Sequence, residues 1–162
     1  MAGYGTDQGL TDWLATNGFT LPGGAPTLAV LRERGSGYVD AVYGWRFCGY
    51  PTGGIDQDRA WPRTGMEVFG QALGDTVIPN AIVNASYRAA WLEASIPGWT
   101  STTVDPSRRI KRQKVEGIER EFFGPETIEF RAGNFARIDG EIEGLLAAFL
   151  CDGRSFPTVL VV

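Results

Sequence analysis

The chain has 162 residues, of which 43% are hydrophobic and 21% are charged, and its formal net charge is −4. A chain of this length fits one domain, which buries about two-thirds of the surface that its unfolded state exposes. It contains no histidine, which excludes histidine-based metal sites and Ser-His or Cys-His catalysis. The small negative charge gives no general attraction to nucleic acid, so any such contact requires a local basic patch.

The two cysteines, Cys48 and Cys151, are too few and too distant in sequence for a disulfide framework or a zinc site. For Cys48 we expect a partly buried thiol. No glycine-rich nucleotide motif occurs, and Asp56 and Asp58 lack the further ligands of a calcium loop. We therefore expect no catalytic residue, no cofactor, no metal and no enzymatic activity.

Membrane insertion and secretion are also not expected. No apolar run approaches the roughly 20 residues that span a bilayer. The first ten residues lack the basic and apolar segments of a secretory signal. These features predict a protein with no membrane partner that is made, and stays, in a cytosol-like compartment.

Two helices are predicted in the first third of the chain. The first covers residues 11–18, where Gly18 suits a left-handed C-terminal cap. The second covers residues 27–43, where apolar residues recur at helical spacing. Gly35 and Gly37 lie inside the second pattern and predict a kink or a close contact with another helix.

Two more helices are predicted further along the chain. The third and clearest opens at Pro79 and ends at Pro97-Gly98, and its alanines and serines allow a neighbouring helix to come close. The fourth covers residues 135–150, with acidic residues towards solvent and towards its N-terminus. Residues 66–76 show no clear pattern, because glycines and polar residues interrupt them.

A charged β-hairpin is predicted between the third and fourth helices. Over residues 108–123 the apolar period is close to two, and Glu116-Gly117 fits the turn. One arm is basic and the other acidic, so the arms can pair with each other or with a neighbouring subunit. Contact of the basic arm with DNA phosphates is the alternative. The charged residues concerned are Arg108, Arg109, Lys111, Arg112, Lys114, Glu119 and Glu121.

The chain ends in an apolar, β-branched segment, residues 155–162. Burying its large side chains would contribute about 1.5–3 kcal/mol each. The segment can fold back as an edge strand of its own subunit, or it can add as a strand to a partner. We favour the partner, because the rest of the chain offers little sheet to extend.

Taken together, the patterns predict a mainly α protein. The expected fold is a small helical bundle over residues 1–154, with a projecting β-hairpin at about residues 108–123. An extended C-terminal docking arm over residues 155–162 completes it.

The stretch from Gly37 to Gly65 is rich in aromatic residues and arginine. Its composition alone fits a long loop that its aromatic side chains hold on a helical core. The runs Tyr38-Val-Asp…Tyr43-x-Trp45-Arg46 and Ala60-Trp61-Pro62-Arg63-Thr64-Gly65 also resemble the signature of a family of tailed-phage neck proteins. These are head–tail connector (adaptor) proteins, which also carry the description DnaT-like single-stranded DNA-binding. The resemblance continues through residues 78–82 and 111–122 to the closing helix, and so covers most of the chain.

The resemblance implies a structural adaptor of the virion neck, assembled in the host cytoplasm. Such a protein forms a dodecameric ring under the portal protein, continues the DNA channel and presents a platform to the next neck or tail protein, a stopper or tail terminator. The resemblance places subunit or lumen contacts on the charged hairpin. It also implies loop anchors at Trp45, Arg46, Trp61, Pro62 and Arg63, and portal docking through Phe156, Val159, Leu160, Val161 and Val162.

A single-stranded DNA-binding protein is the alternative function. The basic run at residues 108–114 is the only nucleic-acid candidate, and no aromatic residue that could stack on bases lies within it. A channel that passes duplex DNA should not hold it tightly, and a mildly acidic surface avoids strong, salt-dependent binding.

Overall fold

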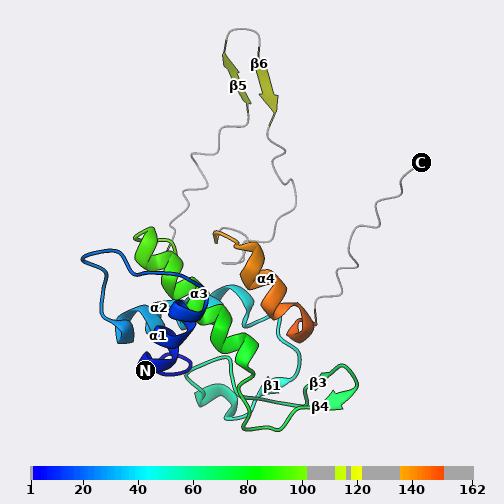
Figure 1. Cartoon of the computed structure of the whole chain (residues 1–162). Coiled ribbons are helices and arrows are strands. Elements are labelled where there is room, and N and C mark those ends of the chain that lie inside the picture. The colour runs from blue at the N-terminus through cyan, green and yellow to red at the C-terminus, as the bar shows by residue number, and fades with distance from the viewer. Residues whose placement is uncertain (1, 102–111, 116–117, 122–135, 152–162) are drawn as a thin grey trace.

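The computed structural model describes residues 2–101, 112–115, 118–121 and 136–151 (Figure 1). Four α-helices dominate these residues, which confirms the predicted mainly α class: α1 (Asp7–Thr16), α2 (Leu28–Tyr43), α3 (Asn80–Ser95) and α4 (Gly140–Leu146). Two short 3-10 turns accompany them, η1 (Gly54–Asp56) and η4 (Ala147–Phe149). The expected C-terminal arm, residues 155–162, lies outside the described residues. Among those residues, no helix has the length and apolar character needed to cross a bilayer.

Six short strands form three separate antiparallel pairs. They are β1 (Tyr50–Pro51) with β2 (Arg63–Thr64), β3 (Glu67–Val68) with β4 (Gln71–Ala72), and β5 (Arg112–Val115) with β6 (Ile118–Glu121). The last pair has the predicted register, because Lys114 stands opposite Glu119 and Arg112 opposite Glu121. The unpatterned residues 66–76 contain the second pair.

The centre of the molecule is the contact between α2 and α3 (Figure 1). A Cβ atom on Gly35 would lie 2.2 Å from the carbonyl oxygen of Ser86 and 2.8 Å from the amide nitrogen of Ala90. Only glycine at position 35 therefore lets the two backbones come this close. Helix α2 is continuous through this point, so the close helix contact is confirmed and the kink is not.

Helix α1 packs against both α2 and α3. It begins at Asp7, earlier than predicted, because the hydroxyl of Thr6 accepts a hydrogen bond from the amide of Gly9 and caps the helix. The hydroxyl of Tyr87 on α3 accepts from the Thr6 amide at 2.9 Å. This side of the molecule is filled by a small apolar cluster, Leu10, Leu14, Leu31, Tyr87, Ala90 and Ala94.

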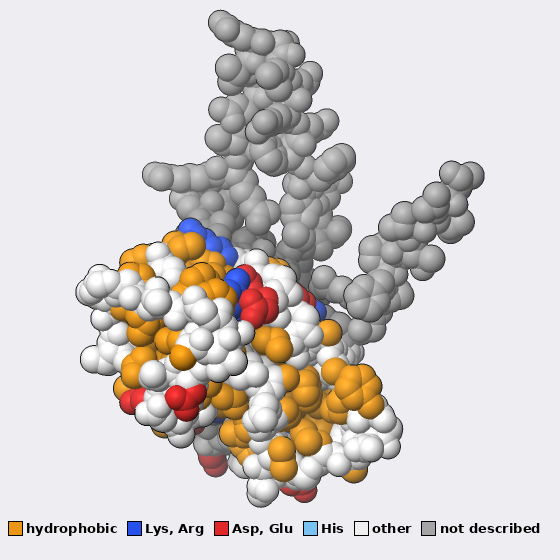
Figure 2. Space-filling model, in the orientation of Figure 1, with side chains coloured by type: hydrophobic (Ala, Val, Ile, Leu, Met, Phe, Trp, Pro, Cys, Tyr) orange, Lys and Arg blue, Asp and Glu red, His pale blue; other side chains and the backbone are white. Residues whose placement is uncertain are grey.

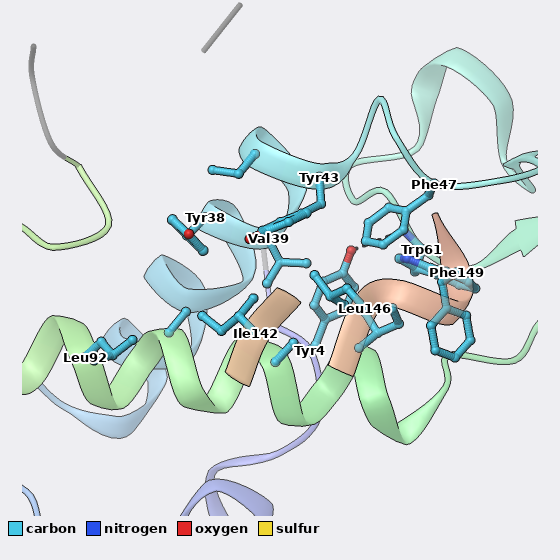
Figure 3. Packing of buried hydrophobic residues seen from close by; sticks show 14 of the residues in the cluster. Tyr4, Tyr38, Val39, Tyr43, Phe47, Trp61, Leu92, Ile142, Leu146 and Phe149 are labelled. Atoms are coloured by element: carbon cyan, nitrogen blue, oxygen red, sulfur yellow. Dashed lines mark hydrogen bonds between the residues drawn. The ribbon is translucent and has the colours of Figure 1, made fainter. Parts of the chain in front are cut away.

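Helix α4 packs on α3 from the opposite side and is shorter than the predicted 135–150. Its N-cap is Asp139, whose carboxylate accepts hydrogen bonds from the amides of Glu141 and Ile142. Arg88 of α3 binds the same carboxylate at 3.2 Å. Asp139 therefore joins the start of α4 to α3. The prediction of helix for the residues just before Asp139 is wrong, because residues 136–138 are not helical. The side chains of Ile142 and Leu146 are buried in the larger apolar cluster of the molecule, which we call the main core (Figure 3).

Candidate functional site

The loop between α2 and α3 is held by a buried guanidinium group. Arg63, at the start of β2, lies in the interior and donates to four backbone carbonyl oxygens. The distances are 3.2 Å to Phe47, 2.7 Å to Cys48, 2.7 Å to Gly49 and 3.0 Å to Ala60. Burial lowers the pKa of Arg63, and no carboxylate of the described residues binds it. The arginine acts as a structural clamp, because its planar fork satisfies carbonyls from both ends of the loop.

Trp61 lies in the same apolar cluster as Phe47 and Phe149 (Figure 3). Its ring is fully buried and meets the rings of Phe47 and Phe149 edge-on, with centroids 5.4 Å and 5.7 Å away. The Trp61 amide donates to the hydroxyl of Tyr4 at 3.2 Å, and a cis peptide bond joins Trp61 to Pro62. The Trp-Pro-Arg run therefore links the loop, the N-terminal segment and the end of α4.

A disulfide bond joins Cys48 to Cys151, with their Cα atoms 4.9 Å apart. The expectation of a partly buried thiol is therefore wrong. The residue pair Phe47 and Leu150 forms an antiparallel bridge beside it, and the Cys151 amide donates to the carbonyl oxygen of Arg46 at 2.8 Å. The 103-residue separation hides this contact in the sequence, because the packing of α4 on α3 is what brings Cys151 back to the loop.

An ionic network ties the loop to α2 and to the N-terminal segment. The Tyr4 hydroxyl donates to Asp40, and Arg59 binds Asp40 at 3.2 Å and Glu33 at 2.6 Å. Burial is the largest influence on Asp40 and raises its pKa, although its hydrogen bonds from Tyr4 and Arg59 act against this. Burial also raises the pKa of Tyr4. These groups bind one another and so join the loop to α2 and to the N-terminal segment.

A second buried carboxylate, Glu93, closes the end of α3. It accepts hydrogen bonds from the amides of Gly98 and Thr100 and from the Thr100 hydroxyl, and Arg34 binds it at 2.9 Å. Burial alone would raise the pKa of Glu93, but these hydrogen bonds and the charge of Arg34 lower it overall. The carboxylate therefore stays ionised and fixes the turn after the helix.

The five loop-anchor residues predicted from the resemblance occupy different environments. Trp61 and Arg63 are buried, and the carbonyl oxygen of Pro62 accepts from the amide of Thr52 at 3.1 Å. Arg46 binds Glu143 of α4 at 3.3 Å and lies over the ring of Tyr43. Trp45 is 45% exposed. The structure thus brings four of the five into the interior network and leaves half of the Trp45 surface in solvent.

The helical body, which we define as residues 2–101 and 136–151, is acidic. It contains seven arginines, no lysine and twelve carboxylates. Six of the seven arginines already bind carboxylates or carbonyl oxygens of the body: Arg32, Arg34, Arg46, Arg59, Arg63 and Arg88. Figure 2 shows correspondingly few blue atoms on the visible face of the body. The body therefore offers little free positive charge.

Of the eight basic residues outside the body, six lie in the hairpin region between residues 108 and 120, and the other two are Arg131 and Arg154. Arg112 and Lys114 stand in β5, opposite acidic positions of β6. Arg108, Arg109 and Lys111 lie outside the described residues, as do the proposed portal-docking residues Phe156, Val159, Leu160, Val161 and Val162. The roles of these residues remain predictions.

One end of the body carries large exposed apolar side chains that sequence reasoning did not single out. Tyr50 is 77% exposed, Ile55 99% and Phe69 92%. All three lie in the segment between α2 and α3, around β1, η1 and the β3–β4 turn (Figure 1), and orange side chains gather over that part of the surface in Figure 2. A possible signal was the dipeptide Phe69-Gly70 between two short strands, which is a turn position where asparagine is more usual.

Comparison with known proteins gives one family. Its model, described as "Putative DnaT-like ssDNA binding protein", matches residues 3–161. No curated protein and no solved structure matches the chain. The family description agrees better with the alternative function, single-stranded DNA binding, than with a head–tail connector.

Proposed function

The chain belongs to the DnaT-like family, whose model covers nearly its whole length, and within that family we propose that it is a structural head–tail connector of a tailed phage or phage-like particle. It would form a ring under the portal protein, surround the DNA channel and join the head to the next neck or tail protein. Its motifs around Trp61 and Arg63 carry the resemblance to connectors, and in the structure these residues fasten the loop to the core.

The observation that carries the proposal is the character of the body's surface. Single-stranded DNA binding needs a positively charged groove with aromatic residues for stacking. The body is net acidic, and six of its seven arginines are engaged in its own ion pairs and hydrogen bonds. Its exposed large side chains are apolar, which favours contacts with proteins over contacts with phosphates.

The disulfide between Cys48 and Cys151 supports the same proposal. Disulfides persist at virion surfaces and outside cells, whereas the cytosol keeps thiols reduced. A connector assembles in the host cytoplasm and then leaves the cell in the virion, where the bond can form and remain. A replication-type DNA-binding protein would spend its working life in a reducing compartment.

Single-stranded DNA binding is the second candidate, and the family description favours it directly. Since the body offers little free positive charge, this function would depend on the basic arm at residues 108–114. Binding through that arm would weaken steeply with salt, because it would release counterions from the phosphates.

A paired titration separates the two functions. The full-length protein is titrated with a labelled single-stranded oligonucleotide by anisotropy at low salt, and with purified portal protein by sedimentation. We expect a stable complex with the portal and no micromolar binding to the oligonucleotide. Deleting residues 155–162 should abolish the portal complex without unfolding the body, because the helices that the structure describes and the disulfide all lie at or before Cys151. Salt-sensitive binding at micromolar or lower concentration, without a portal complex, would select the second function.

A further inference from the structure

The β3–β4 hairpin ends in an unusual turn. The register pairs Val68 with Gln71, so Phe69 and Gly70 form a two-residue turn between them. Both turn residues have positive φ, 52° for Phe69 and 77° for Gly70, as a type I′ turn requires. Glycine adopts this conformation freely, whereas a bulky residue is rarely found there.

Neither the local backbone nor the protein's own core explains a phenylalanine at this position. Asparagine or glycine would suit the backbone of residue 69 better. Phe69 is 92% exposed, so it buries almost nothing against its own chain. An unfavourable conformation that carries an exposed aromatic ring indicates a contact made outside the subunit.

The base of the hairpin is firmly held while its tip projects. Met66, just before β3, is buried, and Val68 and Leu73 pack against the main core. The Leu73 amide donates to the carbonyl oxygen of Met66 at 2.9 Å. The hairpin therefore presents Phe69 from a fixed position, which lowers the conformational cost of inserting the ring into a partner.

Carboxylates and a second aromatic residue belong to the same end of the molecule. Glu67 on β3 is exposed, and so is Asp75, whose carbonyl oxygen accepts from the Thr52 hydroxyl at 2.7 Å and so lies next to β1. Neither carboxylate forms an ion pair with any described residue. Tyr50, 77% exposed, lies on β1 itself. We call Tyr50, Glu67, Phe69 and Asp75 the acidic aromatic end.

We propose that the acidic aromatic end is a docking surface for a protein other than this chain, whose apolar pocket receives Phe69 and whose Lys or Arg rim faces Glu67 and Asp75. The identity of that protein rests on the proposed function: it is the portal protein or the next neck or tail protein. Central aromatic anchors surrounded by polar groups are typical of such contacts.

Charge disfavours two other occupants, DNA and the body of a second copy. DNA phosphates would meet the unpaired carboxylates of this end, and no basic residue of the body stands free beside Phe69 to attract them. The body of a second copy is a poor match, because six of its seven arginines already bind groups of their own subunit. Complementarity therefore points to an unlike protein.

The test combines a substitution with a cross-link. Phe69→Asn places the preferred residue in the type I′ turn and removes the ring. The variant should melt at a temperature about 2–4 °C higher than the wild type, while its affinity for the partner falls at least tenfold. Ile138→Asn is the control, because Ile138 is also a large exposed apolar residue but lies just before the N-cap of α4, outside the segment between α2 and α3. A photoreactive phenylalanine analogue at position 69 of the full-length protein then reports what the tip touches when portal protein and the next neck or tail protein are added in turn.

The proposal expects a cross-link to one of those two proteins, and loss of binding in Phe69→Asn but not in Ile138→Asn. A cross-link to a second copy, to DNA or to nothing would overturn it. Unchanged affinity of Phe69→Asn for a partner that wild-type protein does bind would refute the docking surface alone. If wild-type protein bound neither partner, the proposed function and the docking surface would both fall.

Discussion

Replacing Arg63 is the sharpest test of how the loop is held. Its guanidinium donates four hydrogen bonds to carbonyl oxygens in the interior. A hydrogen bond to a charged group is worth about 1.5–3 kcal/mol, but the four do not add, because the arginine itself is desolvated. In Arg63→Met the carbonyls lose their donors, and we expect the free energy of unfolding to fall by about 3–4 kcal/mol. Arg63→Lys retains a charge but not the planar fork, so it should lose about 1–2 kcal/mol.

Urea unfolding followed by circular dichroism measures these differences. Arg34→Lys is the matched control, since the Arg34 side chain is 48% exposed and its single ion pair should be kept. We expect the control to stay within about 0.5 kcal/mol of the wild type. If Arg63→Lys were as stable as the control, the four carbonyl contacts would not hold the loop, and the clamp would be disproved.

Two further predictions concern covalent and ionic links. The double variant Cys48→Ser, Cys151→Ser should lose about 4 kcal/mol of stability, because the disulfide closes a loop of roughly 100 residues. Reduced wild-type protein should unfold at the same temperature as this variant. Cysteine thiols that react with iodoacetamide in purified particles without reductant would contradict the bond. Glu93 has a pKa below its ordinary value, so its contribution is present above about pH 4.5 and is lost as pH falls through its folded-state pKa. Glu93→Gln should therefore lower stability by about 2 kcal/mol at pH 7 and make stability depend less on pH in the acid range. If the pH dependence in the acid range did not change, the Glu93 carboxylate would not be ionised in the folded protein.

Local patterns predicted most of the helical frame. Helix α2 and helix α3 follow apolar periodicity and are bounded by Thr27 and Pro79, which lie at their N-caps. Gly35 was recognisable as a close-contact position, because glycine destabilises a helix interior and a close packing contact is what offsets this loss of stability. The β5–β6 register followed from the two-residue turn and the opposed charges.

The parts that escaped prediction depend on contacts between distant residues. The Cys48–Cys151 bond forms because α4 and the turn after it bring Cys151 to the loop, and no local sequence pattern indicates that contact. The Arg63 clamp uses backbone carbonyls, which every sequence supplies equally. The β3–β4 hairpin was missed because Phe69-Gly70 replaces the Asn-Gly pair that usually marks such a turn.

The site residues that the resemblance predicts fall into two groups. Trp61 and Arg63, which the resemblance named as loop anchors, lie in the interior. The proposed functions of the charged hairpin and the apolar tail are contacts with other protein chains. The contacts within the helical body do not identify those chains. The acidic aromatic end became visible only when exposure and backbone conformation were known together.

Electron microscopy of the purified protein mixed with its portal protein tests the central proposal most directly. The account predicts an added ring of this chain stacked on the portal, coaxial with the DNA channel. A portal image unchanged by the protein, with the protein remaining a free monomer, would contradict it.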